Sequence, residues 1–131
     1  NKLTRVSLEL GGKNPFVICD DADIENAVHW ASLSAFSNAG QRCAAASRII
    51  VFEKVYEQFI EKLIAKANSL RLGIDETSNL GPLITKKQQI TIQSFIDNAI
   101  KSGGRVLCGG RPPIEINLSK GNYFLPTFIM R

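Results

Sequence analysis

The stretch Pro15-Phe16-Val17-Ile18-Cys19 is a continuous apolar run, and Asp20-Asp21-Ala22-Asp23 follows it at once. A short run of this kind is typical of a strand that is buried on both faces. The aspartates are candidate N-caps for a helix, and the small and apolar residues after them recur at helical spacing. The pattern therefore predicts a strand over residues 15–19 and a helix over residues 23–37.

The same alternation continues along the chain. Residues 48–52 are rich in β-branched side chains and predict another strand. Residues 54–70 carry a broad apolar stripe and predict a second helix. A third helix is expected after Thr85, which forms a capping box with Gln88, and it ends at Gly103.

Three further short strands are expected, over residues 5–10, 105–108 and 123–130. Pro126 interrupts the last of them, which favours an edge strand or a bulge. Strands that alternate with helices of this length predict an α/β fold with a mainly parallel sheet and flanking helices.

Composition excludes several classes of protein. The 131 residues suffice for one domain, and the 16 basic residues exceed the 12 acidic ones only mildly and without clustering, so nucleic acid is not an expected partner. No apolar run is long enough to span a membrane. The chain starts without a methionine or a signal-peptide pattern and ends without a polar tail, so we expect a piece of a longer protein.

The number and spacing of the cysteines bear on disulfides, metal binding and the cellular compartment. Cys19, Cys43 and Cys108 are an odd number of thiols without close spacing, and His29 is the one histidine. This pattern argues against a disulfide framework and against a metal site. A reducing, cytoplasmic compartment is the simplest interpretation.

Cys43 is the first candidate for chemistry. It follows Asn38-Ala39-Gly40-Gln41-Arg42, a polar turn with a glycine and a guanidinium. A neighbouring cation favours the thiolate, and the N–H groups of such a turn can stabilise an anion. The alternative is a small buried cysteine, the usual fate of a free thiol.

Glu9 is the second candidate, 34 residues before Cys43. It ends the alternating run over residues 5–10 and precedes Gly11-Gly12. Partial desolvation at such a place would raise the pKa of a carboxyl group towards the range of a general base. The alternative is a solvated residue on the polar face of a strand.

Other nucleotide and nucleophile motifs are absent. Gly11-Gly12-Lys13 lacks the preceding glycine and the following serine or threonine of a phosphate loop, and no GxGxxG occurs. A cysteine hydrolase would need a histidine partner, for which only His29 is present, in the middle of an expected helix.

Together these motifs resemble the NAD(P)-dependent aldehyde dehydrogenase superfamily. Leu8-Glu9-Leu10-Gly11-Gly12-Lys13-Asn14-Pro15 is similar to the family's glutamate motif, and Phe36-Ser37-Asn38-Ala39-Gly40-Gln41-Arg42-Cys43 to its cysteine motif. The spacing of the two motifs also matches, and the similarity extends over essentially the whole chain. The resemblance implies that residues 1–10 end a cofactor-binding domain and its hinge, and that residues 11–131 are the first portion of the catalytic domain.

The resemblance also implies roles. Cys43 would be the nucleophile that forms a thiohemiacetal and then a thioester, and Glu9 would activate the water that hydrolyses it. Leu10 and Gly11 would lie against the nicotinamide of NAD or NADP, and Gln88 would contact the coenzyme ribose, although helix capping explains Gln88 equally well. Most of the coenzyme site would lie outside this chain, so the chain by itself would be inactive. The enzyme would be a homo-oligomer.

Arg42 stands where the family varies. We hypothesise that its guanidinium binds the carboxylate of a semialdehyde acid, besides favouring the thiolate. A different class of function stays open: the chain could be a catalytically inert α/β binding or assembly module. Under either function, cut sheet edges and an exposed domain face should make the piece prone to self-association.

Overall fold

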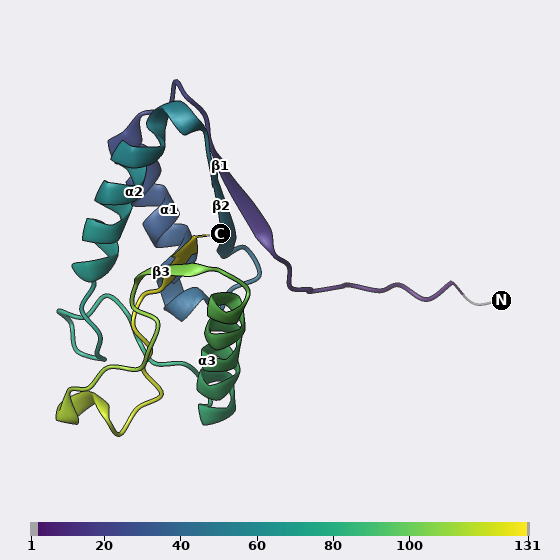
Figure 1. Cartoon of the computed structure of the whole chain (residues 1–131). Coiled ribbons are helices and arrows are strands. Elements are labelled where there is room, and N and C mark those ends of the chain that lie inside the picture. Colours follow the sequence, from purple (N-terminus) through teal and green to yellow (C-terminus); the bar gives the residue numbers. More distant parts are fainter. Residues whose placement is uncertain (1–2, 131) are drawn as a thin grey trace.

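A computed structural model describes residues 3–130. Asn1, Lys2 and Arg131 lie outside this range, and so does the part of the sequence predictions that concerns these three residues. The fold is built around two strands that run side by side, β1 (Asn14–Ile18) and β2 (Ala46–Val51). They pair in parallel, with Phe16 opposite Ile49 and Ile18 opposite Val51. Figure 1 shows the pair, with the preceding N-terminal segment extending away from the body of the molecule.

Two helices pack on one face of this pair. α1 (Ile24–Phe36) connects β1 to β2, and α2 (Glu53–Asn68) follows β2. Phe59, Ile18 and Leu63 are the largest fully buried side chains. They belong to one cluster with Val28, Ala31 and Val55, so the segment that runs β1, α1, β2, α2 contains the core.

The expected α/β class with a parallel strand pair is confirmed, but the expectation that residues 15–19 are buried on both faces is wrong. Val17 on β1 and Ile50 on β2 are 52% and 51% exposed, and Cys19 is exposed as well. Successive side chains of a strand point to opposite faces. Since α1 and α2 cover only one of those faces, the alternate residues stay in contact with solvent.

The second part of the fold contains α3 (Lys86–Lys101), β3 (Arg105–Cys108) and β4 (Phe128–Met130). β3 and β4 pair antiparallel and form a two-stranded sheet of their own. A short 3₁₀ turn, Ile116–Leu118, lies in the loop between them. The predicted strand over residues 123–130 is thus shortened to its last three residues, because the buried Pro126 has no N–H to donate to a ladder.

The predicted strand over residues 5–10 is wrong. These residues are exposed and form no ladder with any part of the chain between residues 3 and 130. Alternating polarity favours an extended backbone, but a strand also requires a neighbouring strand with which to exchange hydrogen bonds. None of the helices within residues 3–130 has the length and apolar character needed to cross a membrane.

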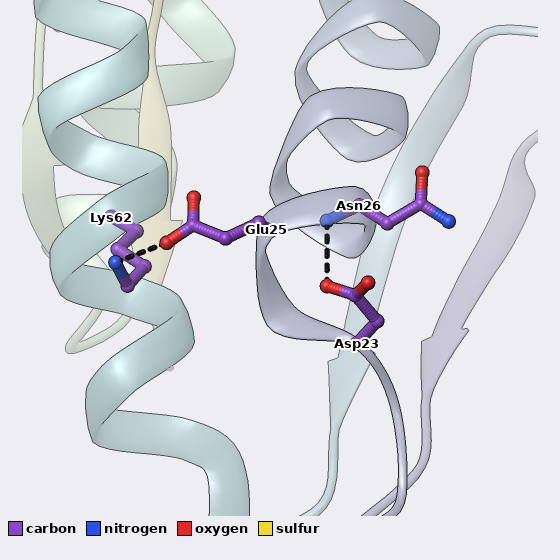
Figure 2. Close-up of polar contacts among 4 residues, drawn as sticks. All are labelled: Asp23, Glu25, Asn26 and Lys62. Carbon is purple, nitrogen blue, oxygen red and sulfur yellow. Dashed lines mark hydrogen bonds and ion pairs between the residues drawn. The ribbon is translucent and has the colours of Figure 1, made fainter.

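The start of α1 follows the predicted capping. Figure 2 shows Asp23 at the beginning of the helix, where one carboxylate oxygen accepts a hydrogen bond from the N–H of Asn26 at 3.1 Å. In the same view Glu25 reaches across to Lys62 on α2 and forms an ion pair. The hydrogen bond that Lys62 donates to Glu25, together with the negative charge of Glu25, raises the pKa of Lys62.

Replacement of the cap tests this account. We expect Asp23→Ala to lower the free energy of unfolding by about 1 kcal/mol, because an N–H at the start of α1 loses its acceptor. Asp21→Ala is the matched control, since Asp21 is an exposed carboxylate two residues earlier. Equilibrium unfolding in urea measures both changes, and equal effects of the two variants would contradict the capping role.

Candidate active site

The two sequence motifs meet at one end of the parallel strand pair. A pocket of about 460 Å³ lies there, lined by Glu9–Lys13, by Gly40–Cys43, and by Ala45 and Ser47. The first segment precedes β1 and the second precedes β2. Because parallel strands have their amino ends at the same edge, the segments that enter them become neighbours. The structure therefore brings Glu9, Leu10, Gly11, Arg42 and Cys43 to the walls of one pocket.

A strained turn leads into Cys43. Asn38, Ala39 and Gly40 have φ values of 53°, 54° and 70°, which places three consecutive residues in the left-handed region. At Gly40 an added Cβ would lie 2.9 Å from the carbonyl oxygen of Ala35, so both the conformation and the space require glycine. At Ala39, the one residue of the three that is neither asparagine nor glycine, this conformation costs on the order of 1 kcal/mol or more.

Gln41 holds this turn against a distant loop. Its Oε1 accepts a hydrogen bond from the N–H of Ile84 at 2.9 Å, and its Nε2 donates to the carbonyl of Asn38 at 3.1 Å. Nε2 also lies 3.5 Å from the carbonyl of Pro82. One amide thus connects the strained turn to the loop before α3, which fixes the backbone immediately before Arg42 and Cys43.

Cys43 itself sits in a tight turn. The N–H of Ala45 donates to the carbonyl of Arg42 at 3.1 Å, which closes the turn around Cys43 and Ala44. The side chain of Asn14 donates to the carbonyls of Cys43 and Ala45 at 2.7 and 3.1 Å. Cys43 is exposed, so the alternative of a buried, inert cysteine does not apply to it.

Arg42 lines two pockets. Its Nη1 donates to the hydroxyl of Ser37 at 3.1 Å. Besides the pocket with Cys43, Arg42 lines a second pocket of about 220 Å³. The exposed side chains of Trp30 and Leu33 line this second pocket as well. Hence its guanidinium is anchored on one nitrogen while its other donors can face a ligand.

The remaining candidates lie elsewhere. Gln88 is exposed and outside the pocket that holds Cys43; its backbone N–H donates to Thr85 Oγ1 at 3.1 Å, which confirms Thr85 as the N-cap of α3. His29 stacks edge-on against Trp30. Among residues 3–130, no group of three His, Cys, Asp or Glu side chains could hold a metal ion. The sequence reasoning did not single out Asn14 and Gln41, whose hydrogen bonds span 29 to 43 residues.

A thiol and a carboxylate on one pocket are groups that suit attack of sulfur on a carbonyl and activation of water by a carboxylate. A model of the aldehyde dehydrogenase family matches residues 1–131. The chain belongs to this family.

Its relatives include several dehydrogenases of different aldehydes. Glutarate-semialdehyde dehydrogenase of Pseudomonas putida is 42% identical over 130 residues, and the NADP(+) succinate-semialdehyde dehydrogenase of Escherichia coli is 41% identical. These alignments cover 98% of the chain and 26% of each relative. The chain thus spans about a quarter of the length of the relatives it matches.

Solved structures agree with this assignment. Betaine aldehyde dehydrogenase of Staphylococcus aureus, determined in complex with NAD+, superposes with a TM-score of 0.90 at 39% identity. The superposition covers 92% of this chain and 24% of that protein. The backbone described above is therefore the one found in this part of the aldehyde dehydrogenase fold.

The exposure of the three thiols generates a prediction. In the folded protein at neutral pH, iodoacetamide should modify Cys19 and Cys43, which are exposed, and leave Cys108 unmodified. Burial raises the pKa of the Cys108 thiol, so less of it is the reactive thiolate. Mass spectrometry of the peptides measures the modification rate of each thiol. If Cys108 in the folded protein reacts as fast as Cys19, its buried position is contradicted.

Proposed function

We propose that this chain is part of an enzyme that oxidises an aldehyde to a carboxylic acid with NAD or NADP. The observation that carries the proposal is the pocket on whose walls Cys43 and Glu9 meet. Membership of the aldehyde dehydrogenase family supports the reaction class. The relatives that act on semialdehydes support the choice of aldehyde oxidation over an inert binding or assembly module.

Cys43 supplies the nucleophile. Its sulfur attacks the carbonyl carbon of the aldehyde, a C–S bond forms, and the π electrons of the carbonyl move to oxygen. The resulting oxyanion needs hydrogen-bond donors. The backbone N–H of Cys43 is the donor that this chain offers, since the hydrogen bond that closes the turn uses the N–H of Ala45 instead.

The pocket fits the nicotinamide end of a coenzyme. Leu10 and Gly11 line it, and a Cβ added at Gly11 would meet nothing within 4 Å, so open space adjoins the backbone on which a flat ring could lie. When bound, the nicotinamide would accept the hydride that leaves the former aldehyde carbon. Leu10 and Gly11 would hold the ring, and Gln88, outside this pocket, is a weaker candidate for a contact to the ribose.

Glu9 completes the reaction. Its carboxylate removes a proton from a water molecule, and the hydroxide equivalent attacks the thioester carbon on Cys43. The C–S bond breaks, the carboxylic acid leaves, and the thiol is restored. A carboxylate on the same pocket as the thiol can reach such a water without any histidine.

Further assignments remain proposals of the same kind. Residues 1–10 would end the cofactor-binding domain and its hinge, and residues 11–131 would begin the catalytic domain. The exposed, irregular course of residues 3–13 suits a hinge. We also expect a cytoplasmic homo-oligomer, and no aldehyde oxidation by the 131 residues alone, because one pocket on this chain offers contacts to only one end of a dinucleotide.

Two substitutions in the full-length protein test the chemistry. We expect Glu9→Gln to leave one rapid turnover per site and then to slow steady-state oxidation by about a hundredfold or more, because hydrolysis of the thioester loses its base. Cys43→Ser should abolish both phases. Rapid mixing with detection of the reduced coenzyme measures the burst. Steady-state rates that survive in Cys43→Ser would refute the proposal.

Arg42 offers a more specific proposal about substrate. Its guanidinium, anchored on Ser37, would bind the distal carboxylate of a semialdehyde acid in the direction of the second pocket. The first relatives named above act on substrates of this type.

The selectivity of the enzyme between acidic and neutral aldehydes tests the recognition of a carboxylate by Arg42. We expect Arg42→Ala to lower the ratio of kcat/KM for a semialdehyde acid over a neutral aldehyde of equal length by about tenfold to a hundredfold, the usual effect of one charge-assisted hydrogen bond. Arg71→Ala, at an exposed arginine outside both pockets, is the matched control. An unchanged ratio in Arg42→Ala would rule out carboxylate recognition by this side chain.

A further inference from the structure

We infer that Asn14 is a positioning residue for the nucleophile: its side-chain amide fixes the orientation of Cys43 towards the pocket that Glu9 shares. The inference rests on the proposed function, since it concerns how the thiol is held for attack. It adds a residue with no ionisable group and no contact to the thiol itself. Asn14 acts through the backbone of Cys43.

The contacts of Asn14 are directed at one turn. Its Nδ2 carries two hydrogens, and it donates one bond to the carbonyl of Cys43 at 2.7 Å and one to the carbonyl of Ala45 at 3.1 Å. Both hydrogens of the amide are thereby used, and both acceptors belong to the turn that presents the thiol. The bonds cross from the start of β1 to the segment before β2.

The strand ladder is irregular directly after Asn14. Asn14 pairs with Ala46, but the next residue, Pro15, pairs with Arg48, so the register skips one residue of β2. Pro15 has no N–H and cannot donate to the neighbouring strand. The amide of Asn14 donates to the carbonyls of Cys43 and Ala45, which directly precede the first ladder residue of β2, Ala46.

The consequence for Cys43 is that the peptides on both sides of its Cα are held. The carbonyl of Arg42, in the peptide before Cys43, accepts the N–H of Ala45. The carbonyl of Cys43, in the peptide after it, accepts Nδ2 of Asn14. With both peptide planes fixed, the direction of the Cα–Cβ bond and of the Cys43 N–H is fixed as well. These are the two groups that the proposed attack requires.

Asn14 also links the two halves of the site. It directly follows Lys13, the last residue of the pocket segment that contains Glu9. A second cross-strand bond runs from Arg48 Nη2 to the carbonyl of Lys13, so it reaches the same segment from β2 and ends on Lys13, not on the turn. The chain therefore provides one cross-link that reaches the nucleophile and one that does not, which is a matched pair for an experiment.

The experiment uses the full-length protein with Asn14→Ala, Asn14→Asp and the control Arg48→Met. Steady-state kinetics give kcat and KM for an aldehyde, and unfolding in urea gives stability. The rate of Cys43 modification by iodoacetamide is followed against pH by mass spectrometry of the peptides. The exposed Cys19 is the internal reference thiol, since it lies at the far end of β1.

We expect Asn14→Ala to lower kcat by about tenfold to a hundredfold with KM changed less than about threefold, because the nucleophile loses its alignment while the walls of the pocket remain. The ratio of Cys43 to Cys19 modification should change in the same variant. Asn14→Asp should shift the pH midpoint of Cys43 modification upward, because a negative charge beside the turn disfavours the thiolate. Arg48→Met should leave both thiol rates close to those of the parent protein, because its bond ends on Lys13 and not on the turn around Cys43.

The outcomes separate the two levels of inference. Parent-like kcat and thiol profiles in folded Asn14→Ala or Asn14→Asp would overturn the positioning role, and so would equal changes of Cys43 modification in Asn14→Ala and Arg48→Met. If one Asn14 variant fails to fold, the other decides. Activity that persists in Cys43→Ser would instead refute the proposed function. If Cys43→Ser loses activity while the Asn14 variants keep the parent kcat and thiol rates, only the positioning role is refuted.

Discussion

The parallel pairing of β1 with β2 is the constraint on which the rest of the structure depends. Two parallel strands need a crossover, and α1 provides it while covering one face of the pair. The same geometry places the segments that enter the two strands at one edge. Glu9 and Cys43 are distant in sequence, yet the pocket between them follows directly from strand direction. The core around Ile18 and Phe59 keeps the two strands in this register.

Much of this arrangement could be predicted from the sequence, because local rules determined it. The apolar run at residues 15–19 and the cap at Asp23 gave the strand and the helix after it. The stripe over residues 54–70 gave α2, and Thr85 gave the start of α3. The two motifs with Glu9 and Cys43 pointed to the segments that line the pocket, although local patterns could not show that these segments meet.

The parts that could not be predicted depend on partners distant in sequence. Alternation over residues 5–10 indicated a strand, but pairing needs a neighbour that residues 3–130 do not provide. Glu9 was therefore expected at the end of a strand, whereas it precedes one. Cys19 was expected in a strand buried on both faces, yet it directly follows the end of β1 and is exposed. Asn14 and Gln41 looked like ordinary polar residues of a turn, because nothing local reveals hydrogen bonds across 29 or 43 residues.

The long-range hydrogen bonds of Gln41 and Asn14 both stabilise the backbone around the strained turn that precedes Cys43. Three left-handed residues in succession, one of them Ala39, are unfavourable in an isolated chain. They persist only where the surroundings determine them, and here Gln41 holds the turn from the side of the loop before α3 while Asn14 holds the next turn from β1. The cost is met during folding, by hydrogen bonds that form whether or not a substrate is present. In the proposed reaction, a thiol presented by such a turn would have little left to reorganise when a carbonyl arrives, which is the condition under which a fixed backbone donor and a fixed nucleophile lower a barrier.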